Sequence, residues 1–435
     1  MTQVHATEPE QGDTDRRNTG AGTWRPRTRR VIRAAIRPGP WKRGLVPAAL
    51  ALLLGLLMLL HAKIPNRGTG NLGSLVETCL PWLGVFILVL LAGALLRRSA
   101  AAMAALLLPA MVWLTLFGGV LNGKSHPGGF LTVASENVDA GNPDPAATAR
   151  DLAASGADVL ALVELTPLAA VTYEKELAKA YPYHTLQGTV GLWSKLPLSD
   201  TQPIDIMDYG PLADTMPADS MMPGNRALRT VVATDHGPLT VYVAHLGSVR
   251  VNLSTGFWTA SRDTGVQVLG QAIAADPGKR VVLLGDLNGS VGDRAFAGIT
   301  AQLESAQDVA GNGFGFTWPA FFPVVRIDEI LVRGVEPDNS WVLPANGSDH
   351  RPVEARIGWL AGALSEGPPP DLEGAVAECA GEVDDPGVAV VEEHRQRRPG
   401  GQPVREGLGD PGLDPGRLVR PLGGGEAGLL DRGAQ

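Results

Sequence analysis

Polar side chains recur at the ends of apolar segments in the middle of this 435-residue chain. The segments TVASEN, VLALVE, VYVAH and VVLLGDLN end in Asn137, in Glu164, in His245, and in Asp286 with Asn288. In α/β sheets, strand ends are where ligand-binding groups converge. A carboxylate in such an apolar setting is costly unless it is paired or binds a metal. We therefore expect these side chains to share a polar or metal-binding site.

Two later segments carry residues of the same kind. RIDEILV places Asp328 within an apolar strand, and GSDHRPV places Ser348, Asp349 and His350 just before the last predicted strand. A turn or a helix cap would explain any one of these residues alone. Turn chemistry does not explain carboxylates, amides and histidines at so many strand ends in one chain, so the set favours a catalytic site.

Short apolar runs alternate with helical stretches from residue 130 onward. This interleaving is typical of an α/β domain, and about 230 residues suit one domain. Helices are predicted at 145–155, 168–180 and 262–275, and strands at 130–135, 158–163, 228–234, 239–244, 280–284, 326–332 and 352–357.

Taken together, these motifs resemble the endonuclease/exonuclease/phosphatase superfamily of metal-dependent phosphoesterases, which includes DNase I-like nucleases, inositol polyphosphate phosphatases and sphingomyelinases. The resemblance covers residues 130–358 and also includes SKLPL at 194–198. It implies a four-layer α/β sandwich of two packed mixed β-sheets flanked by helices. The domain is expected to span residues 128–360.

The resemblance also implies a metal site. Glu164 is the expected principal ligand, with Asn137 and Asp349 beside it. Hard oxygen ligands favour Mg²⁺ or Mn²⁺ over zinc.

Catalytic roles follow from the same resemblance. His350 is expected to activate or orient the attacking water, and Asp328 to fix the tautomer of its ring. Asp286 is the alternative base. Asn288 and His245 are expected to donate hydrogen bonds to the phosphoryl oxygens.

The chain departs from the family pattern at two residues, Glu136, which precedes Asn137 where many relatives have an aromatic residue, and Glu329. Glu329 follows Asp328 where relatives often carry His or Tyr, so we expect it to alter the rim of the substrate pocket. No carboxylate matches as the partner of His245, which leaves the orientation of that ring open.

The formal net charge of −8 is an average over unlike segments. Residues 1–44 carry +6 and residues 45–128 carry +4, whereas residues 129–360 carry −11 and residues 361–435 carry −7. Only two cysteines occur, so a small disulfide scaffold is excluded. The Gly- and Pro-rich acidic tail at 361–435 and the basic leader at 1–44 are predicted to be disordered.

Three apolar runs, at about 45–62, 75–96 and 100–121, have the length of roughly 20 residues that crosses a bilayer. Arginines and lysines crowd the leader and the short second loop, at Arg97 and Arg98. The positive-inside rule then places the amino terminus in the cytoplasm and the domain after the third span outside. A leader that binds nucleic acid is the alternative.

This layout resembles actinomycete membrane proteins associated with teicoplanin resistance, also through the segment PNRGTGNLGSLVETCLPWLG at 65–84. The leading hypothesis is a multi-pass protein of the cell membrane that hydrolyses a phosphate ester or pyrophosphate of a lipid-linked envelope substrate and contributes to glycopeptide resistance. The alternatives are an extracellular nuclease and a non-catalytic envelope or antibiotic-binding protein. The acidic domain disfavours the nuclease, because affinity for nucleic acid grows with the phosphates neutralised by Lys and Arg. A bound metal and a local basic rim formed by Arg226, Arg229 and Arg250 would offset this charge.

Overall fold

Three apolar helical segments begin the part of the chain that the structure describes. The structure is a computed structural model, and it describes residues 44–207, 225–252 and 256–359. The predictions for the leader and the tail therefore lie outside the described residues. The first segment is α2 (Leu45–Leu60) with the short helix η1 (His61–Lys63), and the third is α5 (Ala100–Phe117) with η3 (Gly118–Leu121).

The second segment is interrupted by a proline. It consists of α3 (Leu72–Cys79), the 3₁₀ turn η2 (Leu80–Trp82) and α4 (Leu83–Leu96). Pro81 has no backbone N–H to donate, which disfavours a regular α-helix and fits the 3₁₀ turn here, whereas α5 accommodates Pro109 within its helix. The segment begins at Leu72, three residues before the predicted start at 75. Asn71 has a left-handed backbone with a φ of 56°, and the helix starts directly after it.

By length and composition, three helical stretches could cross a membrane: Leu45–Lys63, Leu72–Leu96 and Ala100–Leu121. Their outward surfaces are apolar, and Leu88 and Leu107 are both more than 60% exposed. Large exposed apolar surfaces of this kind are unfavourable in water and favourable in lipid.

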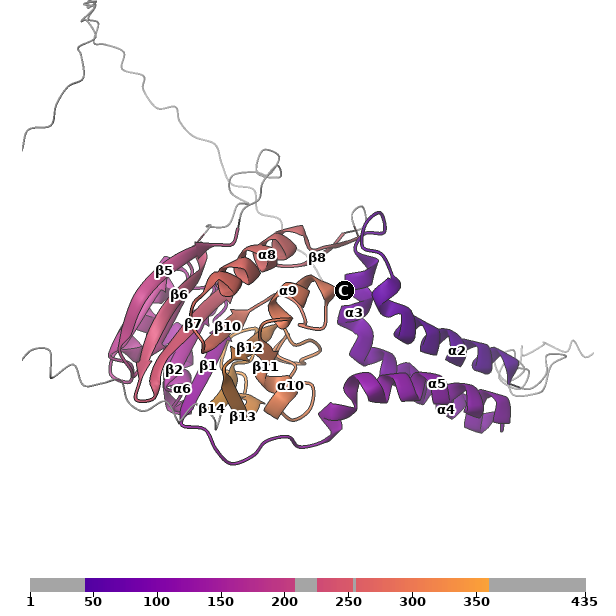
Figure 1. Ribbon diagram of the computed structural model, residues 1–435. Coiled ribbons are helices and arrows are strands. Elements are labelled where there is room, and N and C mark those ends of the chain that lie inside the picture. Colours follow the sequence, from indigo (N-terminus) through magenta and orange to yellow (C-terminus); the bar gives the residue numbers. More distant parts are fainter. Residues whose placement is uncertain (1–43, 208–224, 253–255, 360–435) are drawn as a thin grey trace, which may run out of the picture. The chain divides into compact units, whose positions relative to one another are not determined.

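The rest of the described chain forms two six-stranded sheets (Figure 1). Both are mixed, because β1 pairs with β2 and β7 pairs with β10 in parallel, while their other pairings are antiparallel. The first sheet has the order β13 (Val335–Val342), β14 (Val353–Trp359), β1 (Leu131–Asn137), β2 (Val159–Val163), β4 (Val190–Ser194), β3 (Tyr183–Gln187). The second has the order β11 (Glu304–Ser305), β12 (Asp328–Arg333), β10 (Val281–Asp286), β7 (Gly237–His245), β6 (Asn225–Thr234), β5 (Leu198–Asp205).

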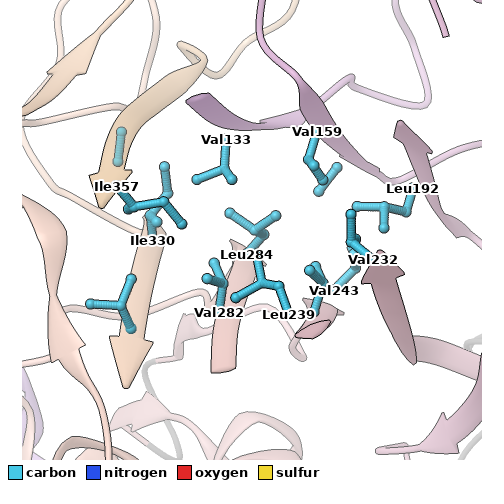
Figure 2. Close-up of a cluster of buried hydrophobic side chains, with 14 of the residues drawn as sticks. Val133, Val159, Leu192, Val232, Leu239, Val243, Val282, Leu284, Ile330 and Ile357 are labelled. Atoms are coloured by element: carbon cyan, nitrogen blue, oxygen red, sulfur yellow. The ribbon is translucent and has the colours of Figure 1, made fainter. Parts of the chain in front are cut away.

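The main core lies between the two sheets. Val133, Val159 and Leu192 of the first sheet face Val243 and Leu284 of the second in Figure 2, and all five are fully buried. Strand side chains alternate between faces, so the continuous apolar runs of β2 and β10 also bury their opposite faces.

Helices cover those opposite faces. A second core joins the first sheet to α6 (Pro145–Ser155) and α7 (Pro167–Leu177), and a third joins the second sheet to α8 (Ala260–Ala275) and α9 (Ala297–Thr300). The predicted four-layer α/β sandwich is confirmed. Two small elements complete it, the hairpin β8 (Arg250–Asn252) with β9 (Gly256–Trp258) and the helix α10 (Ala306–Ala310).

Candidate functional site

Sheet register places three of the predicted residues in one row. Asp286, the last residue of β10, lies opposite His245 on β7 and opposite Asp328 on β12. Residues in register across neighbouring strands point to the same face of a sheet. The parallel pairing of β7 with β10 therefore brings together two residues that lie about 40 positions apart in the chain.

The first sheet contributes an amide and a carboxylate to the same place. Asn137 ends β1, and Glu164 follows β2 with a positive φ of 66°. The Asn137 Nδ2 donates to Glu164 Oε2 at 2.8 Å and to Asp286 Oδ2 at 3.0 Å. Asn137 thus links the strand ends of both sheets, and the left-handed backbone at Glu164 is the kind of strain that persists at functional sites.

His350 lies in the loop before β14 and is held from two sides. The Ser348 hydroxyl donates to the backbone oxygen of Asn137 at 2.6 Å and accepts from the His350 backbone N–H at 3.1 Å. The His350 Nδ1 contacts Asp328 Oδ2 at 2.8 Å, as predicted from the sequence motif. This contact leaves Nε2 directed toward Asp286 Oδ2, at 3.9 Å.

The pKa of His350 is raised to about 10. Burial opposes the charged form, but the contact with Asp328 outweighs it, and Asp286 and Asp349 add to the effect. The ring is therefore an imidazolium at neutral pH, with an N–H on each nitrogen. In this form it is a proton donor and cannot accept a proton from water.

The pKa of Asp286 is raised to about 7. Burial is the largest cause, and the nearby Asp328 adds to it, while His350 and hydrogen bonds from Asn137 and the Asn288 backbone oppose it. A carboxyl group with a pKa near neutrality is suited to general base catalysis.

His245 has a cation as its partner. Arg226 Nη2 contacts His245 Nδ1, and burial together with Arg226 and His350 holds the pKa of His245 well below its usual value. The neutral ring accepts from the guanidinium at Nδ1, so its proton resides on Nε2. That nitrogen lies 3.6 Å from Asp286 Oδ2 and 3.8 Å from Glu164 Oε2. The orientation that the sequence left open is thus decided by Arg226.

Asn288 is held within the site and has a positive φ of 49°. Its Nδ2 donates to the Leu246 backbone oxygen at 2.9 Å and approaches Asp286 Oδ2 at 3.3 Å, and its backbone N–H donates to Asp286 Oδ1 at 2.8 Å. Asn288 therefore orients the Asp286 carboxylate as well as facing the pocket.

The predicted residues converge on one pocket of about 490 Å³. Its wall includes Asn137, Glu164, His245, Asp286, Asn288, Asp349 and His350. Asp328 reaches the pocket through His350. The eight residues predicted from the sequence thus lie together, although they come from both sheets and from the loop before β14.

The donor chemistry of the pocket fits a hard divalent cation. Carboxylate oxygens of Asp286 and Asp328 lie within 4.8 Å of one another, and Asn137 links Glu164 to Asp286. Asp328 Oδ1 is buried and has no hydrogen-bond partner among the described residues. Several carboxylates in one pocket repel each other unless positive charge is present, and oxygen ligands are those that Mg²⁺ and Mn²⁺ prefer.

Two expectations about nearby charges are wrong. Glu329 is buried, accepts from Arg326 at 2.7 Å and from Ser305 at 3.1 Å, and is therefore not at the pocket rim. Arg229, considered as part of a basic rim for nucleic acid, pairs with Asp276 at 2.6 Å. Both side chains are engaged by ion pairs within the domain, Arg229 with Asp276 and Glu329 with Arg326.

Sequence reasoning missed Arg262 of α8. Its side chain is fully buried, and it pairs with Asp263 and Asp293, each at 2.8 Å. Its Nη1 has no hydrogen-bond partner among the described residues, and Arg262 lines the pocket. A Cβ at Gly289 would lie 2.6 Å from Nη1, so the glycine leaves room for this donor. The last glycine of GDLNG indicated that another group approaches the backbone there, but a local sequence pattern does not show that this group is Arg262 of α8.

Comparison with known families gives one match. The model of a family described as "Endonuclease/Exonuclease/phosphatase family" matches residues 134–350, which runs from β1 to His350. No curated protein sequence matches the chain.

Several solved structures are similar to the chain. D. rerio TDP2 complexed with single strand DNA product is 23% identical, over 52% of this chain and 98% of that one, with a TM-score of 0.42. Sphingomyelinase C from Streptomyces griseocarneus is 21% identical, over 52% and 98%, with a TM-score of 0.39. An endonuclease/exonuclease/phosphatase from Bacteroides vulgatus is 16% identical, over 53% and 99%, with a TM-score of 0.42.

Proposed function

Because the chain belongs to the endonuclease/exonuclease/phosphatase family of divalent-metal-dependent phosphoester hydrolases, we propose that it hydrolyses a phosphate ester or pyrophosphate of a lipid-linked cell-envelope substrate. One observation carries the catalytic part of this proposal. A single pocket brings together His245, Asp286, His350 and Glu164. The pKa values of its two histidines are shifted in opposite directions, so His245 is neutral and His350 is charged.

The metal ligands in this proposal are Glu164, Asp349 and Asn137, with Asp286 adjacent. A bound Mg²⁺ or Mn²⁺ would neutralise charge on the phosphoryl oxygens and help position the nucleophilic water. Asn137 Oδ1 already accepts from the Asp139 backbone N–H at 3.0 Å, so it would use its second lone pair.

Asp286 is the general base in this proposal and takes the proton of the attacking water. Its pKa near 7 supports this role, and the imidazolium form of His350 supports the assignment of Asp286 over His350. The His350 Nε2–H then donates to the phosphoryl group, while Asp328 holds the ring in place and balances its charge.

Two further donors face the same group. His245 offers the proton on Nε2, because its Nδ1 is occupied by Arg226. Arg262 offers Nη1, which suits a second phosphoryl oxygen or the distal phosphate of a pyrophosphate. Each well-placed donor to developing charge contributes on the order of 3 kcal/mol to lowering the barrier.

The membrane segment supports the lipid part of the proposal. A site held beside a bilayer meets an embedded substrate at high effective concentration. The nuclease alternative has less support, because Arg226 is buried against His245 and Arg229 is paired with acids. The non-catalytic alternative leaves the buried charges of the pocket without a purpose.

The proposal places the domain of residues 128–360 outside the cytoplasm, on the positive-inside pattern of Arg97, Arg98 and the leader. A contribution to glycopeptide resistance belongs to the same proposal. An alkaline phosphatase reporter fused after residue 359 is expected to be active, and a fusion after Arg98 inactive. The reverse pattern would show that the proposed membrane orientation is wrong, and it would leave the proposed hydrolysis untested by this experiment and still open to the substrate assay.

The test of substrate is a side-by-side assay of the full chain in lipid nanodiscs with Mg²⁺. It offers undecaprenyl pyrophosphate, a phospholipid and plasmid DNA, and follows the released product of each. We expect turnover of the lipid pyrophosphate, loss of turnover with chelator, and loss in His350→Ala. Cleavage of DNA alone would establish the nuclease alternative, and no turnover of any of the three with bound metal would favour a binding protein.

A further inference from the structure

An apolar groove lies where the second and third membrane segments meet the sandwich domain. It has a volume of about 430 Å³. Its walls come from η2, α4, α5 and the loop before β12, and they include Trp82, Leu88, Trp113, Leu114, Phe314 and Phe316. No charged side chain lines it. Its position on two helices that could cross a membrane makes it accessible to lipid.

The aromatic walls of the groove present their apolar faces. The indole N–H of Trp82 donates to the Val324 backbone oxygen at 2.8 Å, and that of Trp113 donates to the Pro81 backbone oxygen at 3.0 Å. The polar atoms of both rings are therefore satisfied within the protein.

Ring packing joins the two sides of the groove. Trp82 stacks on Phe316 with centroids 5.7 Å apart, and Phe316 stacks on Phe314 at 5.0 Å. Trp113 meets Phe314 edge to face at 6.3 Å. Rings from the membrane segment and from the catalytic domain thus form one preorganised surface, which lowers the cost of ordering it on binding.

A second cavity lies between the groove and the catalytic pocket and shares wall residues with both. This middle cavity, also of about 430 Å³, shares Thr78 and Val325 with the catalytic pocket. It shares Pro81, Phe314 and Phe316 with the apolar groove. The three cavities follow one another along α3, η2 and α4. The middle cavity also has charged wall residues, and two of its carboxylates are ion-paired, Glu77 with Arg294 and Asp308 with Arg326.

Polar contacts hold the membrane segment against the domain along this path. Arg294 pairs with Glu77 at 2.7 Å, and its Nη1 and Nη2 donate to the backbone oxygens of Ile64 and His61. The Ser74 hydroxyl donates to Asp293 at 2.9 Å. Ser74 and Glu77 lie on α3 within about one turn of Thr78, and His61 and Ile64 lie in and just after η1, so these bonds position the membrane segment as a wall of the path.

From this continuity we propose that the groove formed by α4, α5 and residues 314–316 binds the hydrocarbon chain of the lipid-linked substrate, while its phosphate occupies the catalytic pocket. The inference rests on the proposed function, since it assigns a place to the lipid part of that substrate. It adds that the membrane segment is part of the substrate-binding site as well as an anchor, and that affinity depends on chain length.

The first test is photo-crosslinking of the full chain in nanodiscs with a long-chain polyprenyl phosphate that carries a diazirine near the chain end. We expect labelled peptides at residues 81–88, 110–114 and 314–316. If labels are confined to the outward faces of α2 and α5, the hydrocarbon chain does not bind in the groove and the inference is wrong. Crosslinks between two copies of the chain at these positions would do the same, because they would identify a second protein as the occupant.

The second test is a groove-filling variant with a matched control. Ala110 lines the groove, whereas Ala104 is exposed on the same helix and lines none of the described cavities. Ala110→Trp is expected to lower kcat/KM for undecaprenyl pyrophosphate about tenfold more than kcat/KM for geranyl pyrophosphate or bis(p-nitrophenyl) phosphate. Ala104→Trp is expected to change none of them.

The outcomes separate this inference from the proposed function. If wild type and Ala110→Trp hydrolyse undecaprenyl pyrophosphate equally well, and labels fall elsewhere, the groove does not bind the chain. The proposed hydrolysis of a lipid-linked substrate is then still supported. If the probe labels the groove but no lipid pyrophosphate is hydrolysed, the proposed substrate is wrong and the lipid-binding site stands. The crosslinking result decides the matter even if Ala110→Trp fails to fold.

Discussion

Asp286 and His350 lie 3.9 Å apart, and their proton affinities differ because only His350 has an anion in direct hydrogen-bond contact. Burial raises the pKa of Asp286 to about 7, and Asp328 with the other nearby acids raises the pKa of His350 to about 10. Between these values the pair consists of a carboxylate and an imidazolium. This is the protonation state that a base and a donor of hydrogen bonds require.

The pH dependence of hydrolysis follows from this pair. Below about pH 7 Asp286 carries a proton and cannot accept another, so kcat/KM is expected to rise about tenfold per pH unit and then level off. A bound cation favours the carboxylate, so more Mg²⁺ should move the midpoint to lower pH. The measurement is kcat/KM from about pH 5 to pH 9 at two Mg²⁺ concentrations. If the midpoint of the pH profile does not change with Mg²⁺ concentration, Asp286 does not lie beside the metal.

Arg262 gives the second prediction at this scale. Arg262→Lys keeps the positive charge beside Asp293 but removes Nη1, a buried donor with no hydrogen-bond partner among the described residues, from a side chain that lines the pocket. We expect kcat/KM to fall by roughly 10- to 100-fold and inhibition by inorganic phosphate to weaken in parallel. Both are measured together with the melting temperature. A lower melting temperature with unchanged phosphate inhibition would assign Arg262 to structure alone.

Among the elements, β10 depends on a glycine next to its catalytic carboxylate. Gly285 has a φ of 143°, and a Cβ there would lie 1.9 Å from the Ala244 backbone oxygen on β7. Gly285→Ala is expected to destabilise the protein by about 2 kcal/mol or more and to displace Asp286. Thermal unfolding and activity check both effects.

Gly298 in α9 is the matched control, because a Cβ there would meet open space and its φ is not positive. Gly298→Ala should be neutral or stabilise by up to about 1 kcal/mol, because alanine favours the helix. Equal effects of the two substitutions would show that the β10 backbone tolerates a side chain at residue 285.

The elements that local patterns predicted are those with strong apolar runs. The helix at Pro145–Ser155 and the strands around Asp286 and His245 lie where expected. The edge strands β3, β5, β11 and β13 were not predicted, and neither was the short buried strand β4. β5 is mostly exposed and contains Pro203, and β13 contains Pro337, so neither has the continuous apolar sequence of a central strand. Their pairing depends on the neighbouring strand, which a local pattern does not contain.

At the scale of the whole molecule, a buried ion pair joins the membrane segment to the domain. The Glu77 side chain is 4% exposed and that of Arg294 is 31% exposed. Glu77→Gln leaves the guanidinium without its carboxylate partner, so we expect a loss of roughly 1–3 kcal/mol. Thermal unfolding in detergent micelles measures this loss, with Arg67→Gln in the exposed first loop as the control.

A double substitution separates the pair from its surroundings. If Glu77 and Arg294 act together, Glu77→Gln with Arg294→Gln should destabilise less than the sum of the two single changes. Strict additivity would mean that the contact does not couple the membrane segment to the domain. A loss of lipid hydrolysis greater than the loss of soluble-ester hydrolysis in Glu77→Gln would link the contact to the groove as well.

The sequence by itself indicated the three apolar segments and the α/β class, because these depend on length and hydrophobic period, which are local properties of the chain. Residue types at strand ends pointed to a shared polar site. The assignment of eight residues to that site, and the pairing of Asp328 with His350, were predicted from the resemblance of its motifs to a phosphoesterase family.

Only the tertiary structure decided the partner of His245, the donor of Arg262 and the groove beside the pocket. Arg226 reaches His245 from the neighbouring strand, Ser74 reaches Asp293 across 219 residues, and Trp82 stacks on Phe316. Such contacts arise because sheet pairing and packing bring distant segments together, and a local pattern carries no record of which segments those will be.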